Sequence, residues 1–211
     1  ADVRLSTPVE RISRADEAVR IETRHGVERY DHVVFASHSD QTLAMLGSDA
    51  SAEERTLLGA IRYQPNRAVL HTDRALLPRV QSTWSAWNYL AGKGTADQRP
   101  VSVSYLINRL QPLPFAQPVV VSLNPFIEPD EAKVIAEFDY AHPVFDQAAI
   151  DAQARMPRLQ GQRNTWFCGA WLGYGFHEDG LRSAVDVANR LGVAAPWLGK
   201  RQASARELEV A

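Results

Sequence analysis

The residues best suited to chemistry lie together near the carboxyl end of the 211-residue chain, in residues 167–184. An apolar run is followed there by glycines and an acidic pair: Gly169, Gly173, Gly175, Glu178, Asp179 and Gly180. Glycines let a ligand approach the backbone closely, and a helix that begins near Gly180 directs unpaired N–H groups toward that ligand. Because such a helix end stabilises negative charge, the stretch predicts a cradle for an anionic cofactor.

A simpler interpretation of the same stretch remains open. Its glycines and Asp179 would serve equally well as the turn and cap of an ordinary core helix. His177 and Glu178 fit either interpretation, since both could cap the helix or bind cofactor hydroxyl groups. The local pattern therefore does not separate a cofactor cradle from a capped helix.

No other arrangement of reactive side chains indicates a catalytic centre. Cys168 and His177 are close in sequence, but the cysteine sits in an apolar strand, where burial raises a thiol pKa and keeps the thiol inert. The six histidines show no HxxxH or HxH spacing, so no metal site is predicted. The absence of a GxSxG elbow argues against an α/β-hydrolase. No residue is assigned as a catalytic acid or base.

Composition excludes several classes of function. The formal charge of -2 gives no basic stripe, so nucleic-acid binding is not expected. One cysteine excludes a disulfide framework and fits a reducing, cytoplasmic setting. The longest apolar runs, such as residues 118–123, are far shorter than the roughly 20 residues of a membrane span. A small-molecule substrate or a protein partner is favoured instead.

The elements expected to position these residues fall into three groups. Apolar runs and turn signals predict strands and then helices in the amino-terminal part, at residues 3–12, 18–23, 30–36, 37–47 and 52–60. The middle predicts an antiparallel sheet, from strands at residues 67–72, 83–90, 101–106, 119–123 and 133–139. The carboxyl part predicts a helix, a buried strand and a helix, at residues 146–155, 166–170 and 181–191.

Aromatic side chains alternate along the second strand of that sheet. Trp87 and Tyr89 should share one face of it, and Trp84 should lie on the other. One face could line an apolar substrate cavity. Plain core aromatics beneath a sheet would give the same pattern.

Three stretches together resemble the flavin-containing amine oxidase family. Residues 169–184 are similar to its carboxyl-terminal flavin-binding motif, and the segment GFHEDGLRSA within them is similar to that of a bacterial branch of predicted NAD/FAD-binding proteins. Residues 3–12 and 30–36, VRLSTPVERI and YDHVVFA, resemble the family's run at the adenine end. The resemblance spans nearly the whole chain, and its specific part is the terminal motif.

This resemblance implies FAD as cofactor and a role for each matching position. Val9 would use its backbone toward the adenine, and Ala36 and Ser37 would lie near the dinucleotide. The resemblance places Gly169, Ala170 and Trp171 near the pyrophosphate and ribityl region. It places Gly180, Leu181 and Arg182 facing the flavin ring. Trp87, Tyr89 and Tyr174 would line the substrate site.

The sequence departs from the family at the cofactor's phosphate. Such enzymes open with a GxGxxG turn and an acidic residue about 20 positions later, and this sequence has neither. Without that turn the pyrophosphate lacks its main helix N-terminus. We therefore expect a fragment that needs a missing amino-terminal segment as partner and binds FAD weakly or not at all alone.

These observations predict an α+β fold in which an antiparallel substrate-binding domain, residues 61–160, is inserted into part of a Rossmann-like FAD-binding domain. That partial domain would comprise residues 1–60 and 161–195, followed by a tail at 196–211. The parent would transfer hydride from a C–N or C–C bond of an amine or an apolar, lipid-like substrate to flavin. A lipid or polyene desaturase or isomerase and a non-catalytic fragment are the alternatives, and homo-oligomerisation stays open.

Overall fold

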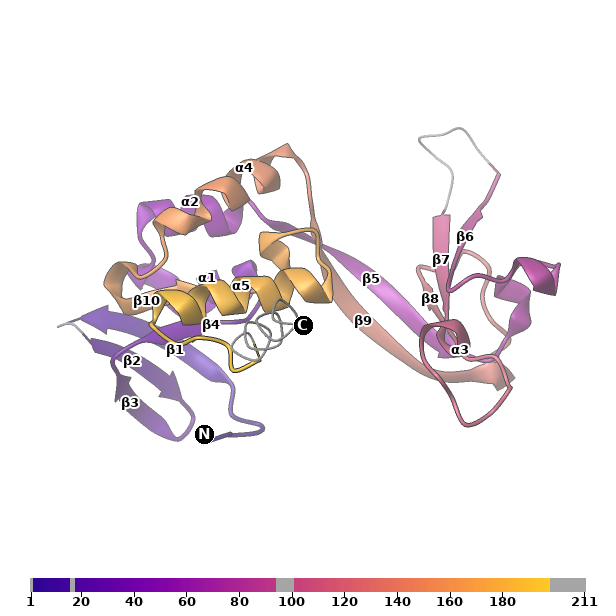
Figure 1. Cartoon of the computed structure of the whole chain (residues 1–211), viewed down its shortest axis with the longest axis horizontal. Helices are drawn as coiled ribbons and strands as arrows, with labels where there is room; N and C mark the ends of the chain where they lie inside the picture. Colours follow the sequence, from indigo (N-terminus) through magenta and orange to yellow (C-terminus); the bar gives the residue numbers. More distant parts are fainter. Residues whose placement is uncertain (1, 16–17, 94–100, 198–211) are drawn as a thin grey trace, which may run out of the picture. The chain divides into compact units, whose positions relative to one another are not determined.

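The computed structural model describes residues 2–15, 18–93 and 101–197, which fall into two compact units (Figure 1). Unit 1 takes the described residues of 1–63 and 143–211, and unit 2 is residues 64–142. Residues 143–160 therefore belong to unit 1 and not to the predicted substrate domain, because the helix they contain packs on an earlier helix of unit 1. Most of the predicted tail, residues 198–211, lies outside the described residues.

Two sheets form the strand layer of unit 1. The strands β1 (Val9–Ala15), β2 (Ala18–Thr23) and β3 (Gly26–Tyr30) pair antiparallel in chain order. The strand β4 (Val33–Phe35) pairs parallel with β10 (Thr165–Phe167). Sequence analysis misses β3 because every residue of it is exposed, so it shows no alternation of apolar and polar residues.

Two of the helices of unit 1, α2 (Ala52–Gly59) and α4 (Gln147–Arg155), begin at a capping side chain. The helix α1 (Ser39–Leu46) is followed by a 3-10 turn, η1 (Gly47–Asp49), and by α2 (Ala52–Gly59). Ser51 and Glu54 form a reciprocal capping box at the start of α2. Asp146 accepts a hydrogen bond from the Ala149 N–H and so begins α4 (Gln147–Arg155). The 3-10 turns η5 (Met156–Arg158), η6 (Gln162–Asn164) and η7 (Ala170–Leu172) and the helix α5 (His177–Arg190) complete the unit.

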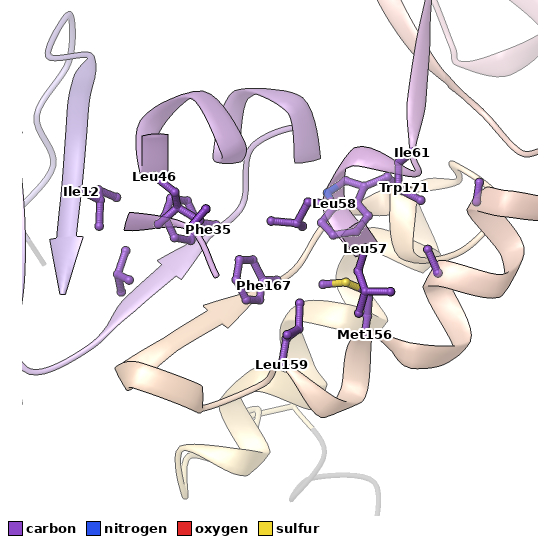
Figure 2. Close-up of a cluster of buried hydrophobic side chains, with 14 of the residues drawn as sticks. Ile12, Phe35, Leu46, Leu57, Leu58, Ile61, Met156, Leu159, Phe167 and Trp171 are labelled. Carbon is purple, nitrogen blue, oxygen red and sulfur yellow. The ribbon is translucent and has the colours of Figure 1, made fainter. Parts of the chain in front are cut away.

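The core of unit 1 joins residues that are far apart in sequence. Phe35 of β4 and Phe167 of β10 stack with ring centroids 5.6 Å apart. Figure 2 shows them among buried side chains from several helices and turns, with Leu58 and Leu159 on either side of Phe167. Burying each of these side chains contributes about 1.5–3 kcal/mol. The core therefore fixes β10 beside β4, and with it the loop that follows β10.

A buried ion-pair network ties the same elements together. The Arg14 side chain is 2% exposed and bonds both oxygens of Glu54. Its Nε donates to Asp49 Oδ2 at 2.6 Å, and its Nη1 donates to Thr165 Oγ1 at 3.2 Å. Arg163 donates to Asp49 Oδ1 and to the Arg14 carbonyl. The network thus holds the start of β10 against β1, η1 and α2.

Unit 2 is built on a five-stranded sheet in the order β6-β7-β8-β5-β9. Its strands are β5 (Arg62–His71), β6 (Trp87–Ala91), β7 (Val101–Leu106), β8 (Val120–Leu123) and β9 (Val134–Val144). Pairing is antiparallel between β6 and β7, β7 and β8, and β5 and β8. The predicted mixed fold with antiparallel sheets is confirmed at this level.

One face of that sheet is buried and polar. His71 Nδ1 accepts from the Asp73 N–H at 3.1 Å, which leaves Nε2 as the donor to Ser122 Oγ at 2.9 Å. Ser122 Oγ lies 2.7 Å from Ser104 Oγ. The 3-10 turns η2 (Arg74–Leu76), η3 (Gln81–Thr83) and η4 (Glu131–Lys133) and the short helix α3 (Ile107–Leu110) also belong to this unit.

The other face of the sheet is apolar and open. Trp87 lies opposite Tyr105, and Tyr89 lies opposite Val103. Trp87 is 57% and Tyr89 69% exposed, so these two aromatics share a face as predicted but are not core residues. Trp84 precedes the strand, which starts at Trp87, and packs against a small apolar cluster.

Candidate cofactor site

The candidate site begins where the two parallel strands of unit 1 end. The Cys168 N–H donates to the Phe35 carbonyl at 2.8 Å and extends the β4–β10 pairing by one residue. Ala36 is exposed immediately after β4, and Gly169 is the second residue after the end of β10. Ligands of parallel α/β sheets bind outside the carboxyl ends of the strands. The structure thus brings two separately predicted segments to the edge where such a ligand binds.

Trp171 joins these segments directly. Its Nε1 donates to the Ser37 carbonyl at 3.1 Å, although 134 residues separate the two. Gly169 has φ of 152°, and a Cβ there would lie 2.6 Å from Trp171 Nε1. Gly169 is therefore needed to seat the Trp171 ring, and the ring orders both loops at the strand ends.

Asp179 holds the glycine loop that leads into α5. Its Oδ2 accepts from the Tyr174 N–H at 3.0 Å and from the Phe176 N–H at 3.1 Å. A Cβ on Gly173 would lie 2.5 Å from Asp179 Cγ, so only glycine leaves room for this carboxylate. Asp179 consequently acts within the protein as a loop anchor.

The helix that follows starts earlier than predicted. It begins at His177, and the Gly180 N–H donates to the Phe176 carbonyl at 3.2 Å inside the first turn. The prediction that the helix begins near Gly180 is wrong, because the Asp179 carboxylate binds the loop amides and lets the helix form three residues sooner. The first-turn amides of His177 and Glu178 are the ones left without a helical acceptor.

Two polar side chains that sequence analysis missed lock this arrangement. Ser183 Oγ accepts from the Gly169 N–H at 2.9 Å and lies 2.7 Å from the Gly180 carbonyl. Gln153 of α4 donates from Nε2 to the Trp171 and Gly173 carbonyls, each at 2.8 Å. Ser183 lies within the carboxyl-terminal motif, so the motif itself could have indicated that Ser183 has a role in the site. No sequence feature near Gln153 indicates its role.

The other predicted cofactor residues occupy varied positions in unit 1. Val9 starts β1, and the register between Val9 and Arg11 is shifted as in a β-bulge. Leu181 is 47% exposed. Arg182 is also exposed, with its Nη1 3.8 Å from Asp179 Oδ1. Ala170 opens η7, and Gly180 lies close to it, since a Cβ on Gly180 would be 3.6 Å from the Ala170 nitrogen.

The predicted substrate-lining residues are divided between the units. Tyr174 is 71% exposed in unit 1, where its ring meets Phe145 edge to face at 6.4 Å between centroids. Trp87 and Tyr89 lie on the open face of the unit 2 sheet. Each is therefore accessible to a ligand within its own unit.

The remaining chemical groups of unit 1 offer no reactive centre. Cys168 is buried, and burial raises the pKa of its thiol, so it stays protonated at neutral pH. Within residues 2–15, 18–93 and 101–197, no three metal-ligating side chains gather. None of the helices described is long and apolar enough to cross a membrane.

A cavity of about 180 Å³ lies between α4, η5 and α5. Met156, Leu172 and Val187 give it apolar walls. Gln153 and Ser183 also line it, but their hydrogen bonds are used in holding the loop. Gly173, Asp179 and Arg182 line it as well, so the cavity adjoins the loop that leads into α5.

Several solved structures share this architecture. The chain matches a CLA-producing fatty acid isomerase from P. acnes with a TM-score of 0.59 and 18% identity, over 87% of this chain and 47% of that one. It matches a putative protoporphyrinogen oxidase from an Exiguobacterium species with a TM-score of 0.56 and 15% identity, over 90% and 47%. The chain therefore has the fold that these structures share. The predicted resemblance is thereby confirmed for the fold.

A third match widens the range of reactions found on this fold. It is reduced UDP-galactopyranose mutase, with a TM-score of 0.55 and 11% identity, over 89% of this chain and 47% of that one. The chain spans about half the length of each of these structures. No protein-family model and no curated protein matches the sequence. Identities this low establish the fold and leave the reaction to be argued from the site.

Proposed function

We propose that this chain forms the carboxyl-terminal part of an FAD-dependent oxidoreductase. The observation that carries the proposal is the meeting of two segments at the carboxyl edge of the β4–β10 pair, where Trp171 bonds to Ser37. Both segments resemble cofactor-binding stretches of one flavoenzyme family, and the fold agrees with that family.

The groups at this edge fit a flavin dinucleotide. The amides of His177 and Glu178 point out of the first turn of a 14-residue helix, where partial positive charge attracts anions. Arg182 adds a guanidinium that is 66% exposed. Ala36 is small and exposed, which leaves access to the strand ends. In this proposal Ala36, Ser37 and residues 169–171 hold the dinucleotide, and residues 180–182 lie toward the ring.

When bound, FAD would supply a two-electron acceptor for hydride from a C–N or C–C bond of the substrate. The chain's own residues would then do two things. The α5 N-terminus would stabilise negative charge at the ring, and the Asp179 and Ser183 contacts would keep the loop in its bound shape beforehand. Preorganisation of this kind lowers the entropic cost of binding.

The test measures flavin retention by the chain joined to the segment encoded ahead of it. Ala36→Glu would place a carboxylate at the strand ends, where like charges about 4 Å apart near a surface cost more than 1.4 kcal/mol. We therefore expect at least about ten-fold weaker FAD binding. Val27→Glu, at a residue 60% exposed on β3, is the matched control. Protein that stays colourless with added FAD would refute the cofactor assignment.

A second candidate reaction is desaturation or isomerisation of an apolar lipid on the same fold. The open face of the unit 2 sheet favours it. Rows of side chains run across strands there without a charged group, from Trp87 through Tyr105 to Val121 and from Tyr89 through Val103 to Leu123. Such a face suits an extended hydrocarbon better than a charged amine. A solved structure of this fold is a fatty acid isomerase.

Ligand titration separates the two substrate classes. Oleic acid below its micellar range should quench tryptophan fluorescence saturably, and Trp87→Ala or Tyr89→Ala should weaken that binding about ten-fold, since central aromatics dominate apolar sites. Trp197→Ala removes an exposed tryptophan of unit 1 and serves as control. Saturable binding of benzylamine, with no response to oleic acid, would favour the amine oxidase reaction instead.

A further inference from the structure

His71 of β5 is fully buried, and the contacts of its ring suit only the neutral imidazole. Its Nδ1 accepts from the Asp73 N–H at 3.1 Å, and its Nε2 lies 2.9 Å from Ser122 Oγ. A protonated imidazole donates from both nitrogens. Protonation would therefore turn Nδ1 into a donor that faces a second donor, the Asp73 N–H, and this hydrogen bond would be lost.

The turn that contacts the imidazole also holds a distant segment, residues 124–133 between β8 and β9, which we call the β8–β9 strap. The Asp73 side chain is 9% exposed, and its Oδ2 accepts from the Asp130 N–H at 2.9 Å. Its Oδ1 accepts from Lys133 Nζ at 3.2 Å. The Thr72 N–H donates to the Lys133 carbonyl at 3.0 Å. Movement of this turn therefore acts directly on the strap.

The contact that the β8–β9 strap makes with the sheet is a loose one. Phe126 and Ile127 are 37% and 48% exposed, and they line a cavity of about 10 Å³ together with Leu76, Leu90 and Ser102. Such a cavity has room for at most one water. The Ser102 hydroxyl is buried and has no hydrogen-bond partner among the described residues, which costs free energy. Opening of the strap would hydrate this hydroxyl and offset part of the cost of opening.

The charges around His71 are arranged so that the imidazole is the group that titrates near neutral pH. Burial is the main cause that lowers its pKa, and the nearby Asp73 carboxylate opposes that effect. The pKa of Asp73 is lowered, chiefly by the Asp130 N–H, and the pKa of Lys133 is raised, chiefly by the Asp130 side chain. Asp73 and Lys133 therefore keep their charges at pH 5.5. On β8 the ring faces the uncharged hydroxyl of Ser122.

We propose that His71 is a pH-sensitive switch that closes the β8–β9 strap when neutral and opens it when protonated. The neutral ring fixes the Asp73 peptide, and the Asp73 carboxylate holds the strap. When the ring takes up a proton from solvent, its new N–H repels the Asp73 N–H and attracts the Asp73 carboxylate. The carboxylate turns toward the ring, so the Asp130 N–H and Lys133 lose their acceptor. The strap then opens, and the cavity beside Ser102 becomes accessible to solvent.

Proton linkage sets the size and the direction of the effect. With the strap open, the imidazole regains its ordinary pKa of about 6.5, whereas burial holds the pKa lower with the strap closed. The closed form is therefore favoured above about pH 6.5 and loses that advantage as pH falls toward the lower value. Uptake of one proton on opening raises the opening constant by at most about ten-fold between pH 7.5 and 5.5. The switch lies within unit 2 and does not depend on flavin binding.

The test is amide hydrogen exchange of the whole chain, followed by NMR at pH 7.5 and 5.5. Dividing each exchange rate by that of an unstructured peptide at the same pH gives the protection of each amide, which reports local opening. The protection of the Asp130 amide should fall about three- to ten-fold at pH 5.5. It should also stay below that of the Ile107 amide, which donates to the Val119 carbonyl at 2.9 Å. His142→Gln removes an exposed histidine and is the control, which should keep this fall.

His71→Asn tests the imidazole itself. An asparagine oxygen accepts from the N–H two residues later and does not titrate, so the protection of the Asp130 amide should change less than about two-fold between the two pH values. If this variant does not fold, NMR titration of the wild-type chain decides. The Asp130 amide shift should then follow the titration of the His71 ring, with a midpoint below about pH 6.5.

Four outcomes would overturn the proposal. One is protection of the Asp130 amide that is the same at both pH values. Another is protection equal to that of the Ile107 amide, because the strap would then open only when the whole unit unfolds. The third is an unchanged pH dependence in His71→Asn. The last is an Asp130 amide shift that does not follow the titration of the His71 ring.

Discussion

Removal of Glu54 should destabilise unit 1 more than any surface substitution nearby. Glu54 and Arg14 have side chains 5% and 2% exposed, and Arg14 bonds both carboxylate oxygens. Deleting one partner of a buried pair costs about 3–5 kcal/mol. In Glu54→Ala, Arg14 still has Asp49 as an ion-pair partner, which favours the lower end of that range. Loss of the hydrogen bond from the Ser51 N–H to Glu54 adds about 1 kcal/mol. We expect Glu54→Ala to cost about 4 kcal/mol.

Urea unfolding followed by circular dichroism measures this loss. The control is Glu53→Ala, the preceding residue, whose side chain is 39% exposed and lies 3.9 Å from Arg155. An exposed pair of this kind contributes about 0–1 kcal/mol. If Glu54→Ala does not fold, Glu54→Gln keeps the shape and half of the acceptors. A cost below about 1 kcal/mol for both Glu54 variants would refute the importance of the network.

The pH dependence gives the same prediction a second test. Burial opposes ionisation of Glu54, but hydrogen bonds from Arg14 and the Ser51 N–H outweigh it and lower the pKa of the carboxyl. A lowered pKa contributes stability above the unfolded value, about 4.3, and loses it as pH falls through the folded value. The difference between the wild-type chain and Glu54→Ala should therefore shrink below about pH 4. A difference that grows in acid would contradict the assignment.

Three further predictions concern the loop and unit 2. Gly169→Ala should lower the free energy of unfolding by about 1–3 kcal/mol more than Gly26→Ala does. Both positions have positive φ, but a new Cβ clashes with a neighbouring side chain only at Gly169. Thermal unfolding of the two variants measures the difference. Ser183→Ala should cost about 1–2 kcal/mol and speed amide exchange at its partner loop, measured by hydrogen exchange. Burial lowers the pKa of His71, so unit 2 should lose stability as pH falls below the unfolded value of about 6.5. Urea titrations at pH 7.5 and 5.5 measure this loss. His142→Gln is the control: that histidine is exposed, so the variant should lose as much stability between the two pH values as the wild-type chain does.

Local patterns predicted the elements of the site well. The predicted run at residues 30–36 contains β4 and the predicted strand at residues 166–170 overlaps β10, although each observed strand is only three residues long. The parallel pairing between them brings their ends together. The fold resemblance from the terminal motif is confirmed. Residue roles toward the cofactor remain predictions that the Ala36→Glu experiment tests.

Long-range contacts set the details that sequence could not supply. The start of α5 depends on Asp179 binding the amides of Tyr174 and Phe176, which no helix propensity encodes. Gln153 reaches loop carbonyls 18 and 20 residues away. Arg14 bonds a residue 151 positions later. Such contacts depend on tertiary packing, so they are invisible to patterns of a few residues.

The division of the core between the two ends of the chain also constrains synthesis on the ribosome. Phe35 stacks on Phe167, so the first partner is made 132 residues (167 − 35) before the second. At about 5–20 residues per second, the amino-terminal strands wait on the order of ten seconds with apolar surface uncovered. Unit 2 is contiguous and leaves the ribosome complete within that interval. Vectorial synthesis thus lets unit 2 fold first, while the core of unit 1 can form only after β10 emerges.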